Sequence, residues 1–145
     1  KVKKENIESL KKEFCQAISK QVGDNLPNPK QKIDITIEQN KITPSLVRSI
    51  EMVEPFGIGN PKPVFGLLNV KIKEIRAMGK EKNHLLLKVV DEKENIIACK
   101  AWKMSKKFED LQVGQYVHIA GVPEFNTFNG YTNVEIVTQD IQKTE

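Results

Sequence analysis

Cysteine and long apolar runs are scarce in this chain of 145 residues. Its two cysteines, Cys15 and Cys99, form no C-x-x-C pair, so the sequence contains neither a disulfide framework nor a thiolate metal motif. Each lies within an apolar pattern, so we expect two buried free thiols in a reducing compartment. No apolar run approaches about 20 residues, so no membrane span or membrane partner is predicted and the cytoplasm is the default location.

Catalytic side chains are equally sparse. The only histidines are His84 and His118, and the aspartates are scattered along the chain. No D-H-H, H-x-D, H-E-x-x-H or paired-carboxylate spacing occurs, so we predict no catalytic residue, no metal site and no cofactor within the chain. Gly57-Ile58-Gly59 is not a phosphate loop, because neither a Lys-Ser/Thr pair nor a helix follows it.

The charge balance is mildly basic, with a net charge of +4. Such a balance permits a polyanionic partner without requiring one. The length suits one ordinary domain, or a small domain plus part of another. The chain begins at Lys1 rather than Met and a helical pattern is under way by residue 7, so we expect a piece of a longer protein.

The first part of the chain predicts a helix, a strand and a second helix. Apolar residues recur at three- and four-residue steps over 7–22 and alternate with polar residues over 33–38. Thr43 is a candidate N-cap, with Pro44 at the first position of a short helix that ends near Val53. One strand cannot close a sheet, so we expect this unit to complete a domain that begins upstream.

Residues 64–141 have the shorter period of β-structure. Strands are predicted around 70–73, 84–91, 96–102, 115–124 and 133–141, with a short helix over 104–111. This order is that of the OB-fold, a five-stranded β-barrel, and an SH3-like or split barrel is the alternative. The predicted fold class is α+β, a partial helix–strand–helix unit followed by a five-stranded OB-fold barrel.

A joint rich in proline and glycine separates the two parts. Gly57 and Gly59 are able to adopt positive φ, and the prolines around them fix φ. Phe56 and Ile58 are large and apolar, so we expect them to fill a hydrophobic seam. The residues assigned to this structural joint are Pro55, Phe56, Gly57, Gly59, Asn60 and Pro61.

The run from Pro55 to Phe65 resembles the "PFG-x-GNP-x-P-x-F" joint of RecJ-type single-stranded-DNA exonucleases. Residues 125–130 resemble the "N-x-aromatic-N-G" loop of that family. The stretch 134–141 resembles its closing strand, with Glu135 where a glutamine is expected. The resemblance assigns 1–54 to the C-terminal part of a DHHA1-like domain, 55–63 to the joint and 64–145 to an OB-fold nucleic-acid-binding domain.

The resemblance implies a parent that is a 5′→3′ exonuclease on single-stranded DNA, dependent on Mn²⁺ or Mg²⁺, in recombination and repair. Its metal ligands would belong to an amino-terminal domain whose motifs do not occur here. We therefore expect this piece to bind and guide the strand without cutting it. The implied partners are single-stranded DNA, the upstream catalytic domain and a single-stranded-DNA-binding protein. The alternatives are a non-catalytic OB module for RNA or DNA and a platform for a protein tail.

OB-folds bind oligonucleotides across their second and third strands, between the loops that join strands 1–2 and 4–5. The first loop, residues 77–84, follows Arg76 and contains Lys80, Lys82 and His84, which are candidates for phosphate contacts. A solvated hairpin tip is the alternative.

The loop between strands 4 and 5 combines aromatic rings with amides. Phe128 and Tyr131 are expected to be exposed and to stack on bases. Phe125 is expected to cap the barrel core instead. The other predicted contacts of this loop, for base edges or backbone, are Asn126 and Asn129.

Strands 2 and 3 can be registered through their turn. If Val90 lies opposite Ile96, the outward positions carry Lys88, Lys100 and Trp102, and the inward positions are all apolar. Two lysines and a tryptophan on one face suit a single strand of nucleic acid. A slip of one residue would invert the two faces, and Trp102 has the alternative of packing under the short helix.

Overall fold

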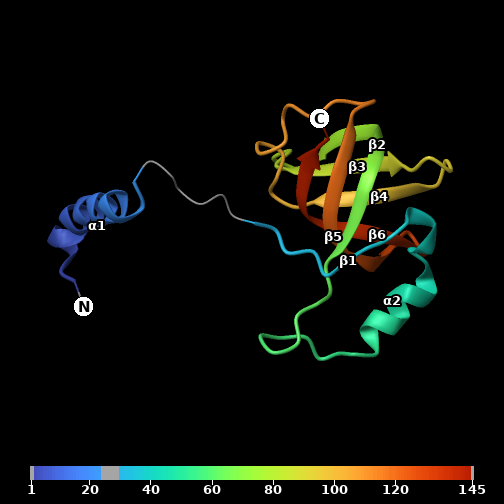
Figure 1. Cartoon of the computed structure of the whole chain (residues 1–145), viewed down its shortest axis with the longest axis horizontal. Coiled ribbons are helices and arrows are strands. Elements are labelled where there is room, and N and C mark those ends of the chain that lie inside the picture. The colour runs from blue at the N-terminus through green and yellow to red at the C-terminus, as the bar shows by residue number, and fades with distance from the viewer. Residues whose placement is uncertain (1, 24–29, 145) are drawn as a thin grey trace. The chain divides into compact units, whose positions relative to one another are not determined.

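The computed structural model describes residues 2–23 and 30–144 of the chain. The chain divides into two compact units, Lys1–Lys30 and Gln31–Glu145. The first contains a 3-10 turn, η1 (Lys4–Asn6), and a helix, α1 (Ile7–Val22). The second contains β1 (Ile35–Thr36), η2 (Gln39–Lys41), α2 (Pro44–Glu51), β2 (Phe65–Met78), β3 (His84–Val90), β4 (Ile96–Ala101), β5 (Tyr116–Phe128) and β6 (Tyr131–Lys143), as Figure 1 shows.

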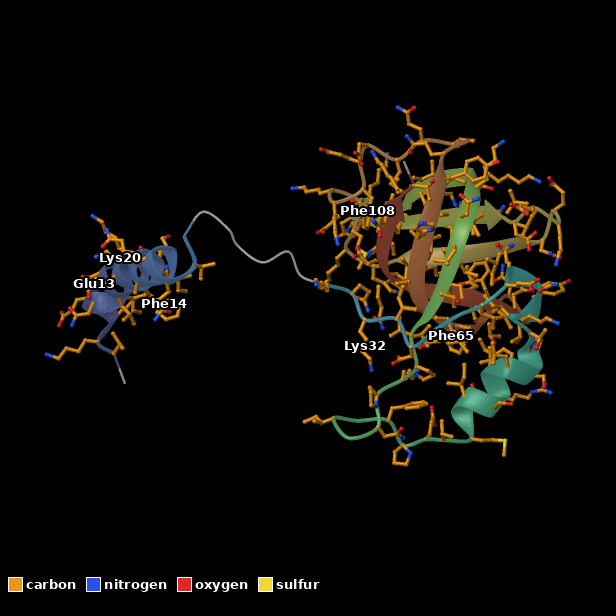
Figure 2. The ribbon with its side chains drawn as sticks, in the orientation of Figure 1. Glu13, Phe14, Lys20, Lys32, Phe65 and Phe108 are labelled. Carbon is orange, nitrogen blue, oxygen red and sulfur yellow. The ribbon has the colours of Figure 1, made fainter. Side chains whose placement is uncertain are left out.

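Helix α1 confirms the predicted span of 7–22. It ends at Gly23, whose positive φ of 63° suits glycine and whose N–H donates to the Ser19 carbonyl at 2.9 Å. None of its residues is buried, and Phe14 is 63% exposed (Figure 2). The prediction of a buried thiol is therefore wrong for Cys15, which is exposed because the apolar stripe of the helix is itself exposed.

Helix α2 begins as predicted. Thr43 is its N-cap, and the Thr43 hydroxyl accepts a hydrogen bond from the Leu46 N–H at 3.3 Å, with Pro44 at the first turn. Val47 and Ile50 are buried on the side of the helix that contacts β5 and β6. Figure 1 shows α2 beside the barrel, so the second unit includes this helix as well as the barrel.

The strand predicted over 33–38 shrinks to β1, which pairs in parallel with the start of β2. Both residues of β1 are exposed, and only Ile37 packs partly against the core. Asp34 secures the segment, since its N–H donates to the Val64 carbonyl at 2.9 Å and its carboxylate accepts the Val64 N–H at 2.9 Å. The alternating pattern therefore indicates a short ladder beside the barrel rather than a half-buried strand.

The sheet confirms the predicted barrel. Its strand order is β1-β2-β3-β4-β6-β5, and a further pairing of β2 with β5 closes strands β2 to β6 on themselves. Among the pairings of the described strands, β1–β2 and β4–β6 are parallel and the others are antiparallel. This is the order of a five-stranded OB-fold with one short extra strand, β1. The largest fully buried core side chains include Leu67, Ile72, Leu87, Ile119 and Ile136.

The helix predicted over 104–111 does not form. The segment is a series of turns with one α-type bond, from the Phe108 N–H to the Met104 carbonyl at 3.2 Å, and one 3-10-type bond, from the Leu111 N–H to the Phe108 carbonyl at 3.2 Å. Phe108 and Leu111 are nevertheless buried in the core. A segment this short is a marginal helix. The spacing of its apolar residues reflects burial, which these turns achieve without a helix.

Candidate nucleic-acid interface

The predicted register of β3 and β4 is confirmed: Val90 lies opposite Ile96 and Leu86 lies opposite Lys100. The inward positions are all buried, which fixes the two faces of this pair of strands. The residues that face inward are Leu85, Leu87, Val89, Ile97, Cys99 and Ala101. We use "outer face" for the opposite side, formed by His84, Leu86, Lys88, Ala98, Lys100 and Trp102.

Two aromatic rings lie at one end of the outer face. The rings of His84 and Trp102 meet edge to face, with centroids 4.9 Å apart. Trp102 is 48% exposed, so it remains available to a ligand rather than lying buried under the 104–111 segment. The His84 Nδ1 accepts the Lys103 N–H at 2.8 Å, which leaves Nε2 to carry the proton of the neutral ring.

The loop beside these rings is shorter than predicted. Strand β2 continues through Met78, so Arg76 belongs to the strand and the loop is residues 79–83. Arg76 lies opposite Leu86, next to the outer face. Lys80 and Lys82 are exposed, and in the described part of the chain no carboxylate pairs with either.

The predicted loop over 125–131 is a continuous β-hairpin. Asn129 and Gly130 form its two-residue turn, with φ of 49° and 79°. An Asn-Gly dipeptide between alternating residues is a strong hairpin signal, and it predicts this turn. Phe128 and Tyr131 lie opposite each other, 71% and 76% exposed, as predicted. Asn129 is exposed at the tip.

The other face of this hairpin is partly covered. Phe125 is half-buried and lines a groove of about 130 Å³ together with Val47 and Ile50 of α2. It therefore packs toward α2, in contrast to the two rings at the tip. Asn126 is half-buried and lies on the same face of the hairpin as Phe128. Its side-chain amide donates to the Glu135 carboxylate at 3.0 Å.

The loop and the hairpin lie at opposite ends of the outer face. Ala98 of β4 lies beside Glu135 of β6 in parallel register, so the earlier residues of β6 extend past the start of β4. Trp102 is at the other end of β4. Eight residue steps separate the level of Trp102 from that of Tyr131, or about 26 Å at the strand rise. Such a span suits several nucleotides of extended strand.

Two carboxylates that were not predicted to belong to the site, Glu74 and Glu135, accompany the cations of the outer face. Glu74 lies opposite Lys88, with an ion pair of 2.7 Å between them. The bond from Lys88 is the main cause that lowers the pKa of Glu74 below its ordinary range. Glu135 pairs with Lys100 at 2.5 Å. The signal for the first pair was an opposite charge across two strands, hidden by a shift of register between Ile72 and Glu74.

The Pro/Gly segment 55–63, predicted to be a joint, is tightly bonded and does not use the positive φ that its glycines allow. The Asn60 side-chain amide donates to the carbonyls of Val53 at 2.8 Å and Pro55 at 3.1 Å. Gly57 and Asn60 exchange two backbone hydrogen bonds. Neither Gly57 nor Gly59 adopts a positive φ. Pro61 is exposed, after this turn.

The apolar residues of the joint behave differently from each other. Phe56 is half-buried, and the Lys62 ammonium lies 5.5 Å from its ring centroid. Ile58 is fully exposed at the tip of the turn, so the prediction that its side chain fills a hydrophobic seam is wrong. The turn presents Ile58 outward because Gly57 and Asn60 close the backbone beneath it.

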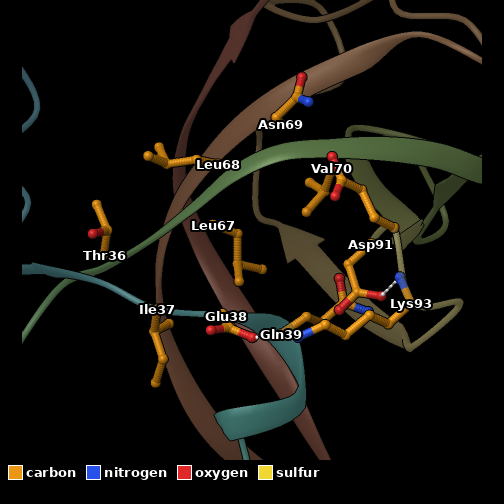
Figure 3. Close-up of a pocket in the computed structure, with 11 residues that line it drawn as sticks. Thr36, Ile37, Glu38, Gln39, Leu67, Leu68, Asn69, Val70, Asp91 and Lys93 are labelled. Atoms are coloured by element: carbon orange, nitrogen blue, oxygen red, sulfur yellow. Dashed lines mark hydrogen bonds and ion pairs between the residues drawn. The ribbon is translucent and has the colours of Figure 1, made fainter.

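A second depression, of about 450 Å³, lies where β1 and η2 meet β2 and the β3–β4 turn (Figure 3). Its charged lining is mostly acidic, with Glu38, Asp91 and Glu92 around Lys93. Lys93 is itself held there. Its ammonium forms an ion pair of 2.8 Å with Glu38, and its backbone N–H donates to the Asp91 carboxylate at 2.9 Å. This depression is poorly suited to a phosphate backbone, which favours the outer face as the candidate interface.

The described residues contain neither a cluster of metal-ligating side chains nor a membrane-spanning helix. Within residues 2–23 and 30–144, no group of three histidine, cysteine, aspartate or glutamate side chains is placed to hold a metal ion. Of the helices in those same ranges, none has the length and apolar character needed to cross a bilayer.

Comparison with known proteins agrees with the barrel. The model of the family described as RecJ OB domain matches residues 33–140. The chain belongs to the RecJ OB domain family. This membership confirms the resemblance predicted from the joint and from the final hairpin.

Two curated relatives carry the name single-stranded-DNA-specific exonuclease RecJ. The chain is 28% identical over 121 residues to the protein of Thermus thermophilus and 24% identical over 117 residues to that of Bacillus subtilis. These matches cover 82% and 81% of this chain. They cover 16% and 15% of the relatives, so the chain spans about a sixth of their length.

Solved structures of RecJ from Thermus thermophilus share the fold over most of the chain. The Mn²⁺ complex aligns with a TM-score of 0.66 at 26% identity, and the Mg²⁺ complex with 0.64 at 27%. Each alignment covers 95% of this chain. It covers 20% and 21% of the solved chains, respectively, so most of each relative lies outside the region compared.

Proposed function

We propose that the Gln31–Glu145 unit binds single-stranded DNA across its outer face. The carrying observation is the arrangement of three features on one side of the barrel. The exposed rings of Phe128 and Tyr131 lie at one end, and the His84–Trp102 pair lies beside the lysine loop at the other. Rings supply stacking and lysines supply phosphate contacts, which together are the usual means of holding a single strand. Arg76, Lys88, Lys100, Asn126 and Asn129 complete the proposed site.

In the parent protein this unit would guide the strand toward a catalytic domain. The relatives are named as single-stranded-DNA-specific exonucleases, which supports a RecJ-like exonuclease as the parent. Its 5′→3′ polarity, its action in recombination and repair and its place in the cytoplasm are part of this proposal and follow from the resemblance of the sequence. In this proposal residues 1–54 are the end of a DHHA1-like domain and 55–63 the joint to the OB domain. A single-stranded-DNA-binding protein is a further proposed partner.

The metal ion required for cleavage is assigned to the parent's catalytic domain. Two RecJ structures were solved with Mg²⁺ or Mn²⁺. The described residues of this chain do not fit such an ion, because they provide no set of three clustered metal-ligating side chains. The proposed part of this chain in the reaction is therefore to bind and direct the strand.

Binding measurements on the 145-residue chain test the proposal. A labelled oligodeoxythymidylate of about 16 nucleotides, the upper end of an OB-fold site, would be compared with a blunt duplex and with an RNA of equal length. We expect preference for the single strand over the duplex, weakened by salt, and no degradation of it when Mn²⁺ is added. Equal affinity for the duplex would contradict the proposal, and preference for RNA would favour an RNA-binding module.

A further inference from the structure

The cations around the outer face fall into two sets. Arg76, Lys88 and Lys100 each lie within 4 Å of a carboxylate, at 3.9, 2.7 and 2.5 Å. In the ranges that the structure describes, Lys80, Lys82 and Lys103 have no such partner. The paired cations lie along the strands, where Lys71 and Lys73 of β2 are also exposed, and Lys80, Lys82 and Lys103 lie at the end near Trp102.

The carboxylate of Glu135 is fully engaged. Its Oε2 holds the Lys100 ammonium at 2.5 Å, and its Oε1 accepts the Asn126 amide at 3.0 Å. The side chains of Lys100 and Glu135 are only 19% and 14% exposed. Water screens such a pair less than it screens a surface pair. A phosphate that approaches Lys100 would meet the negative charge of Glu135 beside it.

Glu74 has the same relation to the neighbouring strand. It lies between Lys88, at 2.7 Å from its Oε2, and Arg76, at 3.9 Å from its Oε1. These side chains are roughly half exposed, so this pair is the more easily opened of the two. Together the two glutamates offset two of the three positive charges of Arg76, Lys88 and Lys100.

Lys103 extends the cationic end. It directly follows Trp102 in a left-handed conformation, with φ of 56°. Its N–H is bound to the ring of His84, which fixes its backbone beside the aromatic pair. Its side chain is exposed. Lys103 is therefore, like Lys80 and Lys82, available to contact a phosphate.

We propose that Glu74 and Glu135 are positioning residues that hold Lys88 and Lys100 away from the phosphate backbone. The middle of the outer face then contacts bases, and phosphate contacts concentrate on Lys80, Lys82 and Lys103. This inference rests on the proposed function, since it concerns how the same face holds a single strand. It predicts a shallower salt dependence than the number of nearby cations suggests, because each phosphate contact with a single strand adds about 0.7 to the slope.

Salt titrations with the labelled oligodeoxythymidylate test the assignment. Glu135→Gln releases Lys100, and Glu74→Gln releases Lys88 together with the more distant Arg76, so each should tighten binding at low salt and steepen the slope by at least about 0.7. The gain should shrink about 2.6-fold between 50 mM and 200 mM salt. Lys103→Gln and Lys80→Gln should each flatten the slope by about the same amount.

Glu8→Gln is the matched control for net charge. It breaks the 2.8 Å pair with Lys11 on α1, in the other compact unit, and should leave the slope unchanged. If Glu74→Gln and Glu135→Gln have the same salt slope as the unsubstituted chain, this inference is overturned. The proposed function would still stand in that case, provided that the unsubstituted chain prefers single-stranded DNA to the duplex. If the unsubstituted chain does not bind the single strand, both proposals fail. Because Glu135 is nearly buried, the more exposed Glu74 provides the variant that is least able to disturb folding.

Discussion

Phe128 lies directly opposite Tyr131 where β5 turns into β6, and both rings are more than two-thirds exposed. Burial gives no structural reason for the pair, because neither side chain packs in the core. An exposed aromatic pair beside a two-residue turn is suited to stacking on bases. The hairpin already holds the backbone of both residues in place, so binding needs to order less of the chain.

Phe128→Ala and Tyr131→Ala should each weaken single-strand binding by about 1–3 kcal/mol, the range measured for stacking on one ring. Neither should shift the melting temperature appreciably, because both rings are exposed. Fluorescence anisotropy and thermal unfolding measure the two effects separately.

Phe125→Ala is the internal control for these variants. Its ring is half-buried against α2, so its loss should cost about 2 kcal/mol of stability, below the range for a fully buried ring. If Phe128→Ala unfolded the chain while binding per folded molecule stayed constant, the hairpin rings would be structural.

The Asn129-Gly130 turn should be sensitive to any added Cβ at its second position. Gly130 has a φ of 79°, so Gly130→Ala forces an L-residue into the left-handed region at about 1–2 kcal/mol. Urea unfolding would measure the loss, and single-strand binding should weaken with it. Gly57→Ala is the matched control, because Gly57 has no positive φ and nothing lies within 4 Å of an added Cβ. Equal stability of the two variants would contradict the turn assignment.

The barrel and the β3–β4 register were predictable from local pattern. Alternation across a short turn leaves one register in which every inward position is apolar and the lysines face outward, and Leu87 and Cys99 are accordingly fully buried. The Glu74–Lys88 pair was not predictable in this way. A shift of register in β2 between Ile72 and Glu74 changes which residues meet, and no pattern within one strand records such a shift.

Hydrophobicity alone also misplaced two residues. Cys15 and Ile58 were expected to be buried because they are apolar or lie in apolar patterns, yet both are exposed. A side chain is buried only when another element covers it, and the pattern of one segment does not state whether that cover exists. The site is therefore predictable in its aromatic and basic residues, and less so in the carboxylates and backbone turns that arrange them.

The two thiols should differ sharply in reactivity. Cys99 is fully buried, and burial raises the pKa of its thiol well above the ordinary range, with the charge of Glu135 adding to the shift. Cys15 is exposed on α1. A thiol-specific reagent should therefore modify one thiol per native chain and two in urea, and Cys15→Ser should abolish the native reaction. Rapid modification of two thiols in the native chain would contradict the burial of Cys99.

The link between Asp34 and Val64 should make the start of the barrel sensitive to acid. The Val64 N–H bond, followed by the bond from Lys32, lowers the pKa of Asp34 below its ordinary value of 3.8. A lowered carboxyl pKa stabilises the folded chain above the unfolded value and loses that contribution as pH falls through the folded value. Asp34→Ala should therefore lower the urea midpoint at neutral pH, and the deficit should shrink below about pH 4. Glu92→Ala, an exposed carboxylate without an ion pair among the described residues, should show no such change, and a pH-independent deficit for Asp34→Ala would refute the assignment.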